Sequence, residues 1–201
     1  MRRIDTKNRG TPARKKEIIH AALECFAELG IDRTGMSDIR KKAGASTGSI
    51  YHHFSSKEQL AGEVYLEGIR NYQEGFLAAM EAGRDARHGV FAVVSYHLKW
   101  VEDNPEWARF LFQQRRADFM KATEEEFVSS NAVFFGRASL WLGRHIKAGS
   151  IRRLPPDLYV ALLLGPCQEY TRMHLAGHAR ANPADIAQEL ADAVWRAIGT
   201  E

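Results

Sequence analysis

Apolar residues recur every three or four positions along most of this 201-residue chain. This spacing places them on one face of an α-helix. Near the N-terminus Ile18, Ala22, Phe26 and Leu29 follow it, and Gly30 ends the run. We find no sustained alternation of apolar and polar residues, the pattern that a half-buried strand produces. The sequence therefore predicts an all-α fold.

Prolines and glycines divide the pattern into separate helices. The first helix is expected to begin near Pro12, because proline suits the first turn of a helix. Ser56, followed three positions later by Gln59, forms a capping-box sequence that is expected to start a long helix running to about Met80. Beyond it we predict helices over 86–102, 105–117, 121–148, 155–178 and 183–198.

Two short helices are expected over 36–43 and 47–53, joined by a turn that contains Gly44. Thr34 and Ser46 carry hydroxyl groups suited to capping their first turns. Two such helices and a glycine turn form the helix-turn-helix pattern, whose second helix enters the major groove of DNA. The pattern indicates a DNA-binding element.

Charge is unevenly distributed along the chain. Residues 1–57 contain 12 Lys and Arg against six Asp and Glu, a net charge of +6, which leaves −3 for the remainder. A basic segment on a mildly acidic body is typical of a nucleic-acid reader. Residues 1–10 are expected to be a basic flexible arm, which either enters a DNA groove or is simply a solvated tail.

The run Tyr51-x-x-Phe54-x-x-Lys57, the glycine turn before it and the preceding helix agree in spacing with a known family. Over about residues 11–65 the chain closely resembles the N-terminal domain of the TetR/AcrR family of bacterial regulators. Gly35 departs from that pattern, where threonine is usual, and so does Arg40, where alanine is usual.

The resemblance implies roles for individual residues of the motif. Thr47, Gly48 and Ser49 occupy positions that approach the bases. Tyr51, His53 and Lys57 occupy positions that contact phosphate, and His52 can reach either. The full set expected to bind DNA is Ser37, Ser46, Thr47, Gly48, Ser49, Tyr51, His52, His53 and Lys57.

The resemblance also extends to the last two helices, which pair with their mates in family dimers. It implies three parts: the arm at 1–10, a helix-turn-helix DNA-binding domain at 11–57, and a helical ligand-binding and dimerisation domain at 58–201. The expected dimer interface is Leu158, Leu162, Gly165, Glu169, Arg172, Ile186, Leu190 and Val194. Some of this apolar surface must also cover the core of its own subunit.

Aromatic residues concentrate between positions 91 and 141, where the resemblance implies the wall of a ligand cavity. For any single aromatic residue, an ordinary place in the core is the simpler interpretation. The residues expected to contact a ligand are Tyr96, Trp100, Phe110, Phe134, Trp141, Tyr170 and His174.

Other classes of protein receive less support from the sequence. We find no nucleophile or acid–base set that indicates an enzyme, and the glycine- and serine-rich segment at 44–49 lacks the lysine of a phosphate-binding loop. His174 and His178 are spaced to clip a metal, but no third ligand is near, so no metal or cofactor is expected. A helical adaptor that does not bind DNA would leave the basic head unexplained.

The remaining composition fits a soluble, cytoplasmic protein. Cys25 and Cys167 form no CxxC pair, as a reducing compartment permits. The longest apolar run, 159–164, is too short to span a membrane. We therefore predict a homodimeric repressor that binds a palindromic operator and is released by a small-molecule effector. An activator or a co-repressor-dependent regulator of the same fold is the alternative.

Overall fold

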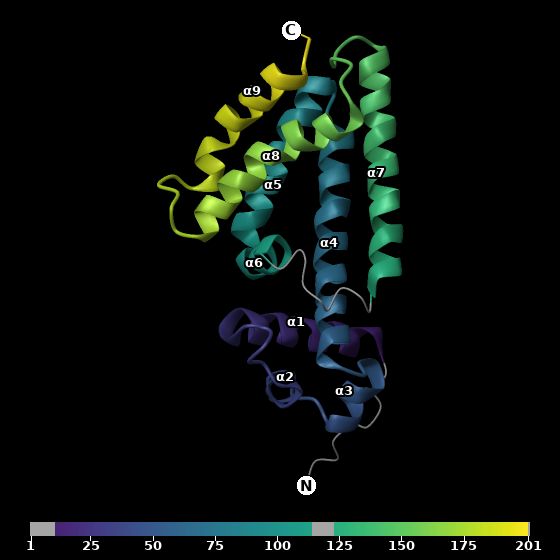
Figure 1. Ribbon diagram of the computed structural model, residues 1–201, viewed down its shortest axis with the longest axis vertical. Coiled ribbons are helices and arrows are strands. Elements are labelled where there is room, and N and C mark those ends of the chain that lie inside the picture. Colours follow the sequence, from purple (N-terminus) through teal and green to yellow (C-terminus); the bar gives the residue numbers. More distant parts are fainter. Residues whose placement is uncertain (1–10, 114–122, 201) are drawn as a thin grey trace. The chain divides into compact units, whose positions relative to one another are not determined.

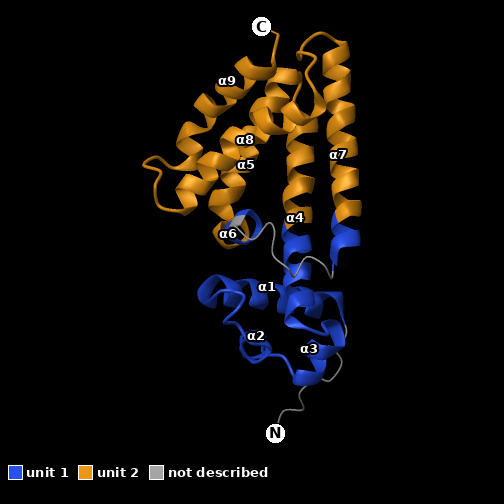
Figure 2. Ribbon diagram, viewed as in Figure 1, with its two compact units in different colours: residues 1–68, 109–127 blue, residues 69–108, 128–201 orange. Residues whose placement is uncertain are grey.

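The computed structural model describes residues 11–113 and 123–200 (Figure 1). Within these residues the chain is helical and contains no strand, apart from one isolated β-bridge between Ile151 and Gly199. This confirms the predicted all-α class. The chain divides into two compact units (Figure 2): unit 1 comprises residues 1–68 and 109–127, and unit 2 comprises residues 69–108 and 128–201. The predicted boundary at residue 57 remains a prediction about functional domains, and the arm at 1–10 lies outside the described residues.

Unit 1 is built around helix α1 (Pro12–Leu29), against which the short helices α2 (Met36–Lys42) and α3 (Thr47–His53) are held. Each short helix offers the core one or two large apolar residues. Ile39 of α2 and Ile50 of α3 are at most 1% exposed, as is Phe54 directly after α3. Seven-residue helices are unstable alone, so this burial, rather than helix propensity, holds them in place.

The cap of α2 differs from the prediction. Gly35, not Thr34, is the N-cap residue, and its amide donates to the Asp38 carboxylate at 2.9 Å. The Thr34 hydroxyl instead lies 2.7 Å from the carbonyl oxygen of Gly30 and is buried, so it ties the connecting loop to the end of α1. Glycine has no side chain to return the bond, and α2 therefore begins with half of a capping box.

The other two predicted caps are present. The Ser46 hydroxyl accepts from the amide of Ser49 at 3.2 Å and so caps α3. At the start of α4 (Lys57–Ala82), Ser56 accepts from the amide of Gln59 at 3.1 Å. The Gln59 side chain reaches one residue further back than a standard box and accepts from the amide of Ser55 at 2.7 Å.

Unit 2 contains the C-terminal part of α4 and most of the remaining helices. These are α5 (Ala86–Asp103), the start of α6 (Pro105–Gln113), most of α7 (Glu124–Lys147), α8 (Pro156–Leu175), the 3₁₀ turn η3 (Pro183–Ile186) and α9 (Ala187–Ile198). Helix α9 packs on α5 and on α8.

The predicted helices of unit 2 need two corrections. The helix expected over 155–178 ends at Leu175, because Gly177 adopts a positive φ of 74°. The helix expected over 183–198 is divided into η3 and α9, since Ile186 has φ −107° and ψ 4°, outside the α-helical range. The end expected at 117 and the start expected at 121 lie outside the described residues.

A chain of three polar side chains crosses the interior of unit 2. His97 of α5 is 0% exposed; its Nδ1 lies 2.7 Å from the Tyr72 hydroxyl of α4 and its Nε2 lies 2.9 Å from the Thr171 hydroxyl of α8. Burial lowers the pKa of His97 to about 4 and raises the pKa of Tyr72. The imidazole is therefore neutral near pH 7, and its two buried hydrogen bonds link three helices.

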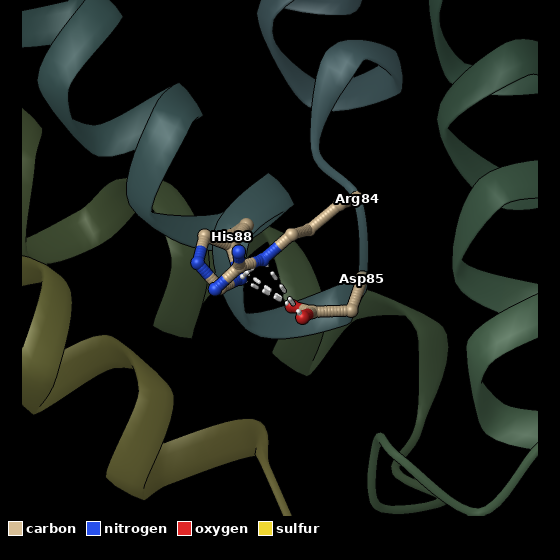
Figure 3. A network of polar contacts seen from close by, with 3 residues as sticks. All are labelled: Arg84, Asp85 and His88. Atoms are coloured by element: carbon tan, nitrogen blue, oxygen red, sulfur yellow. Dashed lines mark hydrogen bonds and ion pairs between the residues drawn. The ribbon is translucent and has the colours of Figure 1, made fainter.

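The connection between α4 and α5 carries a small exposed network (Figure 3). The Asp85 carboxylate accepts from the amide of His88 at 2.9 Å and so caps α5, and it also lies 2.8 Å from the His88 ring. The bond from that amide is the main reason why the pKa of Asp85 is lowered. Arg84 joins the same network, whose role is to start α5.

Both cysteines are buried free thiols, and burial raises the pKa of Cys25 and raises that of Cys167 to about 12. Thiols held in this form are poor nucleophiles and metal ligands. Across the described ranges, no helix is long and apolar enough to cross a membrane.

Candidate nucleic-acid interface

Helix α3 presents one polar exposed face and one buried face. Thr47, Gly48, Tyr51 and His52 are exposed, and Tyr51 is 54% exposed despite its large ring. Ile50, on the other face, is 1% exposed. An exposed tyrosine beside a hydroxyl and an imidazole gives this face several hydrogen-bond donors, as contact with phosphates and base edges requires.

Ser49 needs a correction, because the side chain predicted to read bases is only 3% exposed. Ser49 and Ile50 together form the buried side of α3, and Thr47, Gly48, Tyr51 and His52 form its exposed side. Gly48 next to it is exposed and has no other atom within 4 Å of where a Cβ would lie. The close backbone approach expected at this point therefore depends on Gly48 and Thr47 rather than on the Ser49 hydroxyl.

Lys57, predicted to contact phosphate, has a second role in this structure. Its ammonium group donates to the carbonyl oxygens of Ile31 at 2.8 Å and of Asp32 at 3.2 Å. It therefore joins the start of α4 to the loop that follows α1. An ammonium group has three donors, so one remains for a phosphate oxygen.

The remaining predicted residues of the motif lie around α3. Ser37 in α2 is exposed, and so is Ser46, whose hydroxyl caps α3. His53 is half-buried, with its ring 5.1 Å from that of His52 and 6.0 Å from that of Phe54. His53 thus belongs partly to the packing that anchors α3.

Side chains from α1 fix the geometry of the motif. The Arg14 guanidinium donates to the carbonyl oxygen of Gly44 at 2.9 Å, which ties the turn to α1. The Lys42 ammonium lies 2.7 Å from the Glu28 carboxylate and 3.1 Å from that of Glu24. Those bonds, led by that to Glu28, raise the pKa of Lys42. Both contacts connect α1 to the end of α2 or the turn after it.

These contacts change how the positive charge is counted. Arg14, Lys15, Lys16 and Lys42 are each paired with a carboxylate. Arg40 and Lys41, by contrast, make no ion pair within the described residues, and Lys41 is exposed. From the sequence, Arg40 either adds a contact to the DNA backbone or points to solvent, and Lys41 is not distinguished from the other cations, because charge alone does not reveal which of them are already neutralised.

Most residues predicted to contact a ligand lie in helix packing. The Trp100 indole donates to the Asn71 side chain at 3.0 Å, and the Tyr170 hydroxyl to the carbonyl oxygen of Ala181 at 2.8 Å. The ring of Tyr96 packs over Gly75, where any side chain would collide with it.

The other predicted ligand contacts are also spread over the chain. Phe110 belongs to unit 1 and stacks on Phe26 at 5.8 Å, and Trp141 is 3% exposed with its ring 4.3 Å from that of His145. His174 is half-buried in the last turn of α8. These residues therefore belong to separate packing contacts within their own units.

Unit 2 contains a cavity of about 450 Å³ between α4, α7 and α8. Of the seven predicted ligand contacts, Phe134 alone lines it. Its walls come from one face of each helix: Phe76, Met80, Phe134, Phe135, Ala138, Ser139, Leu142, Pro156, Asp157, Tyr159, Val160, Leu163 and Leu164. Nine of the thirteen are not aromatic, and Phe76 and Tyr159 lie outside residues 91–141, so the concentration of aromatic residues in that range did not point to them. Their spacing by three and four along each helix was visible but is shared with ordinary core.

The predicted dimer residues differ in their exposure. Leu158, Glu169 and Arg172 on α8 are exposed, and the last two form an ion pair at 2.6 Å. Leu162, Gly165, Ile186 and Leu190 are half-buried. Val194 is 1% exposed and belongs to the core of its own subunit, which corrects its assignment to the interface.

His174 and His178 have no further metal ligand beside them: the described part of the chain holds no group of three His, Cys, Asp or Glu that could bind a metal ion.

Comparison with known proteins agrees with this geometry. Residues 18–64, from α1 into α4, match the family described as bacterial regulatory proteins, tetR family. The chain is 25% identical over 180 residues to the HTH-type transcriptional regulator BetI of Agrobacterium fabrum, covering 88% of this chain and 82% of BetI. It is 25% identical over 167 residues to the HTH-type transcriptional regulator RutR of Escherichia coli, covering 82% and 76%.

Among solved structures, the fold is similar to that of the transcriptional regulator FadR from Bacillus subtilis in complex with stearoyl-CoA. The TM-score is 0.77 at 19% identity, covering 89% of this chain and 96% of FadR. A two-unit helical protein with an exposed recognition helix is the architecture of a DNA-binding transcription regulator. Residues 18–64 thus match the tetR family of bacterial regulatory proteins, and the relatives that match over most of this chain are transcriptional regulators rather than enzymes.

Proposed function

We propose that this chain is a homodimeric repressor that binds a palindromic operator and is released from it by a small-molecule effector. The observation that carries the proposal is the face of α3, where Thr47, Gly48, Tyr51 and His52 are exposed around a buried anchor. The turn before α3 is tied to α1 by Arg14, and the helix after α3 is tied to the loop that follows α1 by Lys57, so this face is held rigidly enough to fit a groove.

Within the helix-turn-helix motif and the start of α4, we assign different roles to different residues. Thr47 and His52 contact base edges, and Gly48 lets the backbone approach them. Tyr51, Lys41 and the third donor of Lys57 contact phosphates, which supply affinity and salt dependence without reading sequence. Arg40 is a further phosphate contact, since it is a cation of α2 without an acidic partner in the described residues.

A dimer follows from the size of the reader. One seven-residue helix covers only a few base pairs, and two half-sites about one helical turn apart supply the missing specificity. We place the interface on the exposed strip of α8 that contains Leu158, Glu169 and Arg172.

Release from DNA requires two conformations of the dimer, one whose two recognition helices fit adjacent half-sites and one whose helices do not. The effector must bind the second conformation more tightly than the first. Helix α4 contributes residues to both units and is the element that would carry this change.

The proposal is tested by selecting fragments of the source genome on the purified chain at moderate salt. We expect a few enriched fragments that share an inverted repeat, and a gene whose transcription rises when the regulator is deleted. Retention of random fragments without a shared repeat contradicts the operator, and a fall in transcription on deletion indicates the activator alternative.

Variants separate the proposed roles. Lys41→Ala is expected to weaken binding to all sequences and to lower the salt slope by about one, whereas Lys99→Ala in unit 2 leaves the slope unchanged. Thr47→Ala is expected to relax the preference at one base position.

The dimer is tested separately. Leu158→Asp is expected to lower the molar mass measured by light scattering from that of a dimer to that of a monomer. Leu140→Asp, on the 72% exposed Leu140 of α7, is the matched control.

A further inference from the structure

The cavity of unit 2 has the size of a small-molecule site and contains one charged side chain. Its volume of about 450 Å³ lies in the range of ligand pockets. Phe76 and Met80 of α4, Phe134 and Leu142 of α7, and Leu163 of α8 form apolar walls. Such walls favour a hydrocarbon or aromatic body and offer few hydrogen bonds to a polar one.

Two polar side chains of the lining are exposed, and the third, Tyr159, is buried with its hydroxyl already bonded to the carbonyl oxygen of Arg152 and the amide of Leu154. Asp157 and Ser139 are both exposed, whereas Phe134 and Leu163 are buried. Phe135 and Val160, which are 44% and 45% exposed, also line the cavity. The cavity is thus apolar inside and has its carboxylate where a ligand's polar end would meet water.

The sign of the charge there is negative. Asp157 lies in the first turn of α8, whose N-terminus acts as roughly half a positive charge. A full carboxylate outweighs that half charge, so the charge carried by the lining itself is negative. Arg152 and Arg153, in the segment before α8, are exposed and do not line the cavity, and no Lys, Arg or His of the described residues does.

We infer that the effector of this regulator is an apolar molecule with a positively charged amine at one end, bound with its body between α4, α7 and α8 and its amine beside Asp157. The inference rests on the proposed function, since it names the class of effector that function requires. It disfavours coenzyme A thioesters and other ligands with several phosphates, because no Lys, Arg or His of the described residues lines the cavity.

Direct binding without DNA tests the position of the site. We propose titrating the chain with N-phenyl-1-naphthylamine, an apolar dye whose fluorescence rises in an apolar cavity. Ala138→Phe, which fills the cavity from α7, is expected to weaken binding at least tenfold. Ala132→Phe, an exposed position on the same helix outside the lining, leaves it unchanged. Circular dichroism reports whether Ala138→Phe folds, and Ser139→Phe at an exposed lining position replaces it if it does not.

Displacement of the dye tests the charge. Decylamine, 1-decanol and decanoate share one chain and differ in the charge of the head group at pH 7. Because Asp157 is exposed, we expect a modest order: decylamine about threefold tighter than decanol and about tenfold tighter than decanoate. Asp157→Asn is expected to make decylamine equal to decanol. Asp185→Asn, an acidic first-turn residue of η3 outside the lining, is expected to keep the preference.

Two results overturn the inference: dye binding that is unaffected by both folded filling variants, or decanoate binding as tightly as decylamine. The outcome for the proposed function is measured separately, by adding decylamine to the complex with a selected operator fragment. The expected order of binding without any release of DNA supports the ligand class and contradicts release by this effector.

Discussion

The two units use their polar side chains in different places. In unit 1 two long side chains make contacts at or near the surface, where Arg14 binds the carbonyl oxygen of Gly44 and Lys57 binds that of Ile31, beside the buried hydroxyl of Thr34. In unit 2 the central contact is internal, where His97 at 0% exposure joins Tyr72 to Thr171. Short helices need hydrogen bonds from the side chains of neighbouring helices to hold them in place. Long helices that share a large core need a buried polar contact to fix their register.

This difference predicts where each unit is sensitive to substitution. An exposed hydrogen bond contributes little to stability, because water bonds to the remaining partner when the bond is lost. An internal polar chain is costly to break, since its remaining members stay in the core. All four tryptophans of the chain lie in unit 2, so tryptophan fluorescence follows the unfolding of that unit.

The largest effect is expected at His97. His97→Ala removes two buried hydrogen bonds and leaves a cavity, so we expect a loss of about 4 kcal/mol in the free energy of unfolding. Urea denaturation followed by tryptophan fluorescence measures it. Thr171→Val keeps the packing and removes one bond, with an expected loss of about 1 kcal/mol. If His97→Ala costs no more than His88→Ala at the exposed start of α5, the polar chain does not organise unit 2.

The hydrogen-bonded side chains of Tyr72, His97 and Thr171 should also make the stability of the protein depend on pH. The pKa of His97 is about 4 in the folded state because of burial, against 6.5 for an ordinary histidine. Between these values the unfolded chain binds the proton and the folded chain does not, so stability is full above pH 6.5 and falls as the pH drops toward 4. The expected loss is about 3 kcal/mol. Urea denaturation of the wild type at pH 7.5, 5.5 and 4.5 should show the fall, and His97→Leu should flatten it. If the free energy of unfolding falls equally with pH in the wild type and in His97→Leu, His97 is not the cause.

In unit 1 a single exposed hydrogen bond should matter less. Arg14→Ala loses the bond to Gly44, and we expect a cost of about 1 kcal/mol. The loss should appear as faster amide hydrogen exchange in residues 36–54, because the turn between α2 and α3 opens locally. Lys16→Ala, which removes a 66% exposed side chain 3.5 Å from Glu67, serves as the control and should leave exchange unchanged. A global effect as large as that at His97 would remove the distinction between the units.

The smallest effect is expected at the cap of α2. Gly35→Ser supplies the missing half of the capping box, with an expected gain of about 0.3 kcal/mol. A Cβ at Gly35 meets the Asp38 carboxylate at 3.2 Å and the Ser37 hydroxyl at 3.4 Å, which can both adjust. Gly35→Ala adds the same Cβ without a hydroxyl and should instead lower stability by a few tenths of a kcal/mol. Thermal melting followed by circular dichroism compares the two, and a gain with alanine would show that capping is not the cause.

Local patterns predicted unit 1 better than unit 2. Ile39, Ile50 and Phe54, the large apolar residues of the motif, are all buried, as large apolar residues of two short helices that pack on a third are expected to be. Ser49 shows the limit of local patterns. A residue with a small hydroxyl fits either face of a short helix, and only the folded unit shows that this one is buried. Thr34 was assigned to the wrong end of a loop for the same reason.

By itself, the sequence determined the helical class, the limits of most helices, and the family of the reader. Helix periodicity and caps act over three or four residues, so the chain specifies them without reference to its fold. The tertiary structure alone decided which aromatic residues pack as core, which cations are already neutralised, and where a cavity remains. Those depend on the side chain that a distant helix places opposite: Gly75 makes room for Tyr96, Glu28 neutralises Lys42, and a gap between Met80, Leu142 and Leu163 leaves space for a ligand.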